Sequence, residues 1–180
     1  MANDRIDALL APGYLEGLTS LPMDEVRNRR TECQAVEVSL SYLRRMVQGR
    51  LDIVLAEVKG RRDGTGQGDL HSLVDQHPEI LSEGVHAPGN GRLSGLMAPA
   101  EPEIDGELMD ELNTVASPDC LGQLPTTSDE ELRQLIDGLS ALEREVSGRR
   151  KALHERIDAL QEEIVRRYKS GEANVDALLK

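Results

Sequence analysis

Apolar residues recur at intervals of three and four in two separate stretches of this 180-residue chain. This spacing keeps one side of an α-helix apolar and drives two helices to pack along a narrow seam. The expected seam residues are Val36, Leu40, Val47, Leu51, Val54 and Val58 in the first stretch, and Leu142, Val146, Leu153, Ile157, Leu160 and Ile164 in the second. The pattern predicts an all-α fold built on a two-helix coiled-coil hairpin.

The starts of both long helices carry recognisable signals. Pro22 and the acids that follow it favour a helix start, so the first helix is expected over residues 22–59, after which glycines favour its end. Thr127 or Ser128 is the expected N-cap of the second helix, which should occupy residues 128–170 and end before the next glycine.

The rest of the chain is less regular. The connection over residues 60–127 holds most of the Gly and Pro, so it is expected to be partly disordered. An N-terminal segment, residues 1–21, and a short tail, residues 171–180, complete the chain. Short apolar segments that could form accessory helices or dock on the hairpin are expected at residues 5–10, 69–81, 106–116 and 175–179.

The two long helices are copies of one pattern, because sliding the chain by 106 residues aligns them without a gap. Five polar positions match along with the apolar register, and four of the five are identical. Four such matches by chance are on the order of 1 in 10,000, so a shared task explains them better than an ordinary solvated face. The motif, Glu-x3-Ser-x2-Arg-x3-Gln/His-x3-Asp, comprises Glu37, Ser41, Arg44, Gln48 and Asp52 in the first copy and Glu143, Ser147, Arg150, His154 and Asp158 in the second.

The motif positions share one side of each helix. At 100 degrees per residue they fall within a stripe about 80 degrees wide, roughly 100 degrees round from the seam. The two stripes are therefore expected to line a groove beside the helix interface, where their side chains are free to bind a ligand.

Composition narrows the class of protein. The chain has no Phe, no Trp and 3 Tyr, which disfavours a broad globular core. Its net charge of -12 argues against DNA or an acidic membrane as partner, and no apolar stretch approaches the roughly 20 residues that span a bilayer. Cys33 and Cys120 form no disulfide framework or zinc signature, so we expect a cytoplasmic protein.

Carboxylates and guanidinium groups on one narrow stripe suit a ligand with both donor and acceptor edges. Guanine is such a ligand, because its N1 and N2 hydrogens can be accepted by Glu or Asp while its O6 and N7 accept an Arg fork. Two equivalent stripes favour a ligand with twofold symmetry, and a cyclic dinucleotide has it. Basic residues that could offset phosphate charge beside the stripes are Arg45, Arg50, Lys151 and Arg156.

The doubled motif, with its complete first copy from Glu37 to Asp52, resembles the cyclic di-GMP signature of the RsiG family of actinobacterial anti-sigma factors. The resemblance covers both long helices. It implies that the helices run antiparallel and that a dimer of cyclic di-GMP binds the ten motif residues. It further implies that the loaded protein sequesters the sporulation sigma factor WhiG from RNA polymerase and so represses late sporulation genes. The second copy departs from the pattern at His154, whose contact is the least secure.

Other functions compete with this interpretation. A structural helical-hairpin adaptor would use its polar stripes on another protein and bind no nucleotide. An enzyme that hydrolyses the dinucleotide is disfavoured, because an open groove excludes water poorly and no catalytic set is apparent, so no catalytic residue is expected. His71 and His77 lie six residues apart, off the spacing that aims two ligands at one metal, so neither a metal nor a cofactor is expected.

Overall fold

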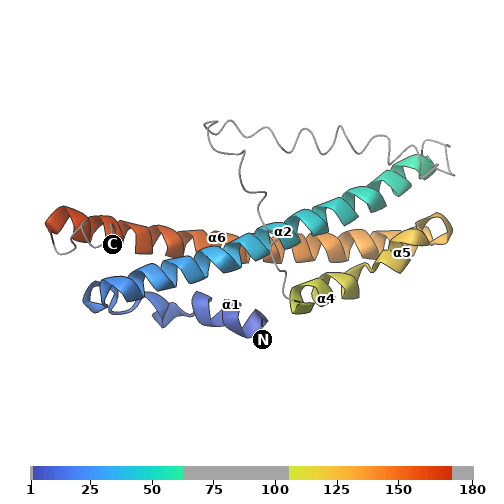
Figure 1. Cartoon of the computed structure of the whole chain (residues 1–180). Helices are drawn as coiled ribbons and strands as arrows, with labels where there is room; N and C mark the ends of the chain where they lie inside the picture. Colours follow the sequence, from blue (N-terminus) through green and yellow to red (C-terminus); the bar gives the residue numbers. More distant parts are fainter. Residues whose placement is uncertain (1, 63–105, 172–180) are drawn as a thin grey trace, which may run out of the picture.

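A computed structural model of the chain describes residues 2–62 and 106–171 (Figure 1). Two long helices, α2 (Met23–Arg62) and α6 (Asp129–Ser170), dominate it. The shorter elements are α1 (Ala2–Leu10), the 3-10 helices η1 (Pro12–Leu15) and η2 (Leu18–Ser20), α4 (Gly106–Val115), α5 (Pro118–Gly122) and the 3-10 helix η3 (Leu124–Thr126). The described residues contain no strand, so the prediction of an all-α fold is confirmed.

The long helices form an antiparallel pair. Arg27, near the start of α2, donates a hydrogen bond to Tyr168, near the end of α6. Arg61, near the end of α2, forms an ion pair with Asp129, the first residue of α6. Figure 1 shows the two helices crossing at a shallow angle with their chain directions opposed. The predicted helical hairpin is therefore the frame on which every other element is placed.

The seam between α2 and α6 is the core of the molecule. All twelve expected seam residues belong to one apolar cluster, and those at its centre are almost fully buried. Each fully buried aliphatic side chain stabilises the fold by roughly 1.5–3 kcal/mol. The buried residues are Val26, Cys33, Val36, Leu40, Leu43, Val47 and Val54 from α2, and Leu132, Leu139, Leu142, Val146, Leu153, Leu160 and Ile164 from α6. Leu51, Val58 and Ile157 are partly buried beside them.

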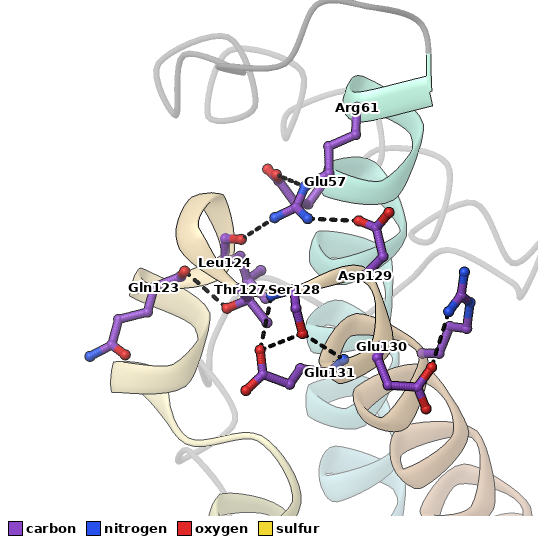
Figure 2. Close-up of polar contacts among 10 residues, drawn as sticks. Glu57, Arg61, Gln123, Leu124, Thr127, Ser128, Asp129, Glu130 and Glu131 are labelled. Carbon is purple, nitrogen blue, oxygen red and sulfur yellow. Dashed lines mark hydrogen bonds and ion pairs between the residues drawn. The ribbon is translucent and has the colours of Figure 1, made fainter.

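The ends of the long helices agree closely with their sequence signals. Ser128 is the N-cap of α6, and its side chain and that of Glu131 each accept a hydrogen bond from the other residue's backbone N–H, a capping box (Figure 2). The helix ends at Gly171, whose left-handed φ of 76 degrees suits glycine. At the other end of the hairpin α2 continues past its expected end at Lys59 to Arg62, because tertiary contacts of its last turn hold it in place.

The contacts of that last turn centre on Arg61, which Figure 2 shows. Its Nε donates to Glu57 at 2.8 Å, its Nη1 to Asp129 at 2.9 Å, and its Nη2 to the carbonyl oxygen of Leu124 at 2.6 Å. One guanidinium therefore ties the end of α2 to η3 and to the start of α6. This network outweighs the roughly 1 kcal/mol that a glycine at position 60 costs a helix.

Two short helices, α1 and α4, pack on the same side of the hairpin (Figure 1). Arg156 of α6 donates to the carbonyl oxygen of Leu10, at the end of α1. Arg50 of α2 donates to the carbonyl oxygens of Leu112 and Ala116, at the end of α4. A cation at a helix C-terminus binds the carbonyls that have no partner within the helix. Each short helix is thus fixed by an arginine of the long helix from the other half of the chain.

The docking of α1 and α4 agrees with the expected apolar segments at residues 5–10 and 106–116, and Ile6, Leu9, Leu108 and Leu112 are buried. The segments expected at residues 69–81 and 175–179 lie outside the described residues.

The 106-residue repeat extends beyond the long helices to every described element. Adding 106 to Pro12, which opens η1, gives Pro118, which opens α5, and η2 over residues 18–20 corresponds to η3 over residues 124–126. The polar contacts repeat as well. Arg61 donates to Glu57 and to the carbonyl oxygen of Leu124. Its equivalent, Arg167, donates to the equivalent partners, Glu163 and the carbonyl oxygen of Leu18. The described structure is a pair of similar halves related by an approximate twofold axis.

Candidate functional site

The two motif copies lie on facing stripes of α2 and α6 and are joined by reciprocal ion pairs. Arg44 on α2 donates through Nε to Glu143 on α6 at 2.9 Å. Arg150 on α6 donates through Nε and Nη2 to Glu37 on α2, at 3.1 and 2.9 Å. The approximate twofold axis exchanges these two pairs. The glutamate of each copy therefore binds the arginine of the other, and the two copies form one site.

The motif serines lie between these pairs, near the centre of the hairpin. Ser41 donates to Glu37 at 2.7 Å, and Ser147 donates to Glu143 at 2.9 Å, each across one helical turn. Ser147 also accepts a hydrogen bond from Arg44 at 2.9 Å. The centre of the site thus consists of two clusters of charged and hydroxyl groups beside the apolar seam, and each cluster joins α2 to α6.

The surroundings keep both glutamates ionised. Burial raises the pKa of Glu37, but hydrogen bonds from Ser41 and Arg150 and the charge of Arg150 lower it by more, so its net shift is downward. The hydrogen bond from Ser147 is the largest influence on the pKa of Glu143, and with Arg44 it lowers that pKa despite partial burial. At neutral pH each glutamate can therefore accept hydrogen bonds from a ligand.

Beside the centre lies a groove of about 480 Å³ between the two helices. Two motif residues of α2, Gln48 and Asp52, line it together with the partly buried Leu51. Its opposite wall consists of Ser140, Glu143 and Arg144 of α6. The prediction that the stripes flank a groove beside the seam agrees with this arrangement for the first copy of the motif.

The last two residues of the second copy are placed differently. His154 reaches back toward the centre, with its Nε2 3.2 Å from the Glu37 carboxylate that Arg150 also binds. Asp158, the twofold equivalent of Asp52, lies exposed at the outer end of the stripe. The structure therefore brings seven motif residues into two polar clusters, one around Glu37 and one around Glu143, and leaves three outside them. The seven are Glu37, Ser41, Arg44, Glu143, Ser147, Arg150 and His154, and the three are Gln48, Asp52 and Asp158.

The basic residues expected to offset phosphate charge divide into two groups. Arg45 and Lys151 are exposed at the edge of the motif stripes. The phosphate role expected for Arg50 is wrong, because its guanidinium is buried against the end of α4. Arg156 likewise binds the end of α1. Each of these arginines follows the motif glutamate of its own helix by thirteen positions. At 100 degrees per residue, the arginine therefore lies about 140 degrees round the helix from that glutamate. The accessory helices α1 and α4 therefore cover the side away from the site.

Sequence reasoning missed two groove residues, Ser140 and Arg144. Both lie on α6 beside Glu143, but neither belongs to the repeated motif. Arg144 corresponds to Val38 in the first half, so the comparison of the halves hid it. The sequence feature that could have identified Arg144 is its position directly after the motif residue Glu143, at the edge of the motif stripe.

Other kinds of site find little support within residues 2–62 and 106–171. No group of three His, Cys, Asp or Glu there could hold a metal ion, and no helix there is long and apolar enough to cross a membrane. Cys33 is buried in the seam, as its alignment with Leu139 predicts, and Cys120 is partly exposed; both are free thiols. The doubled motif is the strongest candidate site in this part of the chain.

Comparison with known proteins identifies a family. The model of a family described as RsiG-like matches residues 12–81 and 119–180, which is more than half of the chain and includes both long helices with all ten motif residues. No curated protein matches the chain.

Proposed function

The chain belongs to the RsiG-like family, and on that premise we propose that it binds a dimer of cyclic di-GMP in the motif groove and, so loaded, sequesters a WhiG-type sigma factor from RNA polymerase. The family indicates the coarser part of this function, an anti-sigma factor with a sigma factor as its partner. The nucleotide, the type of sigma factor and the repression of late sporulation genes are the proposal.

The observation that carries the proposal is the pair of reciprocal ion pairs between the motif copies, in which the arginine of each copy binds the glutamate of the other. It places arginine and carboxylate side by side twice, in the combination that the two hydrogen-bonding edges of guanine require. Within the described residues Arg44 binds only through Nε, which leaves both terminal nitrogens of its guanidinium for a fork to O6 and N7. A guanine can thus join the pair without first separating it.

The approximate twofold axis supports a symmetric ligand. A dimer of cyclic di-GMP can itself have twofold symmetry, so its two molecules can make equivalent contacts with the two ends of the motif site. The site lies on the side of the hairpin away from Arg50 and Arg156, which bind the ends of α4 and α1, and its groove is open to solvent. An asymmetric mononucleotide would use only half of the arrangement.

The alternative is a helical-hairpin adaptor without a nucleotide ligand, in which the ion pairs only strengthen the interface between α2 and α6. Partly exposed ion pairs typically contribute about 1 kcal/mol or less, so they are a weak device for stability alone. Hydrolysis of the dinucleotide is disfavoured, since the groove is open to water.

The test is a calorimetric titration of cyclic di-GMP into the full chain, alone and with a WhiG-type sigma factor. We expect wild-type protein to bind the nucleotide, and Arg44→Ala and Arg150→Ala to weaken binding at least about tenfold, the effect of losing a charge-assisted fork. Arg133→Ala, which removes a charge far from the motif, is the matched control. Circular dichroism checks that all variants keep their helices.

The adaptor alternative predicts a different outcome. If wild-type protein binds no cyclic di-GMP in either state, the signalling function is wrong. If it binds but both arginine variants match Arg133→Ala, the ligand binds elsewhere and the site assignment is wrong. Recovery of unchanged nucleotide after long incubation would dismiss hydrolysis.

A further inference from the structure

The two halves of the motif site are unequal despite their shared pattern. At one end the groove is open, and Gln48 and Asp52 line it. At the other end His154, the equivalent of Gln48, lies against Glu37 instead. The approximate twofold axis therefore relates two ends with different contacts, and we call the end lined by Gln48 and Asp52 the open end and the end where His154 contacts Glu37 the closed end.

The two motif arginines also differ in how many of their nitrogens donate to the glutamate of the other helix. Arg44, beside the open end, donates to Glu143 through one nitrogen. Arg150, beside the closed end, donates through two nitrogens to Oε1 of Glu37. His154 contacts the same oxygen atom. A ligand that replaces contacts at Glu37 must displace more hydrogen bonds than one that binds at Arg44.

The positions next to the motif glutamates differ most. Arg144, after Glu143, is exposed on the wall of the open groove and forms no hydrogen bond or ion pair within the described ranges. Its equivalent, Val38, is 49% exposed and presents only methyl groups. The flanking cations Arg45 and Lys151 are equivalent to each other, so they do not distinguish the ends.

We propose that Arg144 is a further ligand-binding residue, which binds a phosphate of the nucleotide, and that the open end consequently takes up the first cyclic di-GMP. This inference rests on the proposed function and adds an order of binding to it. The exposed guanidinium of Arg144 on the groove wall attracts the dianionic ligand and holds its phosphate with charge-assisted hydrogen bonds. The closed end has no such group at position 38, and it fills second and more weakly.

A pair of exchange variants tests this directly. Arg144→Val gives the open end the residue of the closed end, and Val38→Arg gives the closed end the residue of the open one. Both positions are exposed, so neither change disturbs the seam. Arg133→Val, which makes the same substitution at an exposed position of α6 outside the groove, controls for the change in net charge.

In a calorimetric titration with cyclic di-GMP we expect Arg144→Val to weaken the tighter binding step about tenfold, while Arg133→Val does not. Val38→Arg should strengthen the weaker step by a similar factor and bring the two steps together. Guanosine, which lacks phosphate, should bind wild-type protein and Arg144→Val equally, since the contact is to phosphate.

Two results would overturn the inference in distinguishable ways. If wild-type protein binds cyclic di-GMP and Arg144→Val binds it equally well, Arg144 has no part in the site while the proposed function stands. If wild-type protein binds no cyclic di-GMP, with or without the sigma factor, the proposed function fails and this inference falls with it.

Discussion

Arg167 and Arg61 occupy equivalent positions in the two halves, yet their surroundings differ enough for a quantitative prediction. Arg167 donates to Glu163 at 2.6 Å and to the carbonyl oxygens of Leu21 and Leu18 at 2.7 and 2.8 Å. The side chains of Arg167 and Glu163 are 7% and 6% exposed. At the other end the side chain of Arg61 is 25% exposed.

Replacing Arg167 with Met keeps an apolar stem but removes a buried charge. Breaking a buried ion pair typically costs 3–5 kcal/mol, and Glu163 keeps a second partner in Arg166, so we expect a loss of about 3 kcal/mol. Arg61→Met removes a more solvated set of contacts and should cost about 1 kcal/mol.

Equilibrium urea unfolding, followed by circular dichroism at neutral pH, measures the difference. With a typical urea dependence of about 2 kcal/mol per molar, Arg167→Met should lower the unfolding midpoint by roughly 1.5 M and Arg61→Met by roughly 0.5 M. Equal shifts for the two variants would refute the argument, because they would mean that burial of the pair does not determine its contribution.

Two further predictions concern titration and reactivity. Hydrogen bonds from Arg166 and Arg167 lower the pKa of Glu163 to about 2, below its ordinary value, so its stabilisation is complete above about pH 5 and is lost as pH falls toward 2. The urea midpoint should drop over that window, and Glu163→Gln should remove this part of the slope. Burial raises the pKa of Cys33, so a thiol reagent should modify Cys120 more than about tenfold faster, as mass spectrometry of the labelled peptides would show.

The long helices were predictable because their signals are local and repeated. The apolar register determines which side of each helix is buried, and Ser128 with Glu131 defines the start of α6 through contacts that span one turn. The end of α2 was less predictable. Its last turn depends on Arg61 binding η3 and α6, and such contacts between distant segments leave no local pattern.

The accessory elements show why part of the repeat escaped notice. Arg50 and Arg156 bind backbone carbonyl oxygens of α4 and α1, and every residue has a carbonyl oxygen, so these contacts place little demand on the sequence. Few side chains then need to match, and Pro12 with Pro118 is among the few identities that remain. The same reasoning explains the error at Arg50, since a guanidinium suits a carbonyl cluster as well as a phosphate.

Differences between the halves were also hard to interpret from the sequence. Arg149 aligns with Leu43, an apparent flaw in the seam, yet Arg149 donates to Asn3 of α1 and pairs with Glu145. At the equivalent positions Leu43 is fully buried, and the counterpart of Asn3 is Met109. Two polar partners in one half thus correspond to two residues of the apolar cluster in the other. A departure from the repeat marks a local change of partner and not a failure of packing.

The arrangement also explains how a chain with a net charge of -12 could bind an anion. Each motif glutamate is already neutralised by an arginine of the other helix, so the centre of the site carries no net repulsion toward a phosphate. A guanine that accepts from Arg44 and donates to Glu143 would add contacts to that pair, whereas a buried carboxylate without its arginine would repel the ligand and resist desolvation. The pairing between helices and the capacity to bind would then depend on the same four charges. Loss of either arginine should therefore weaken ligand binding far more than it weakens the hairpin, which the buried seam holds together.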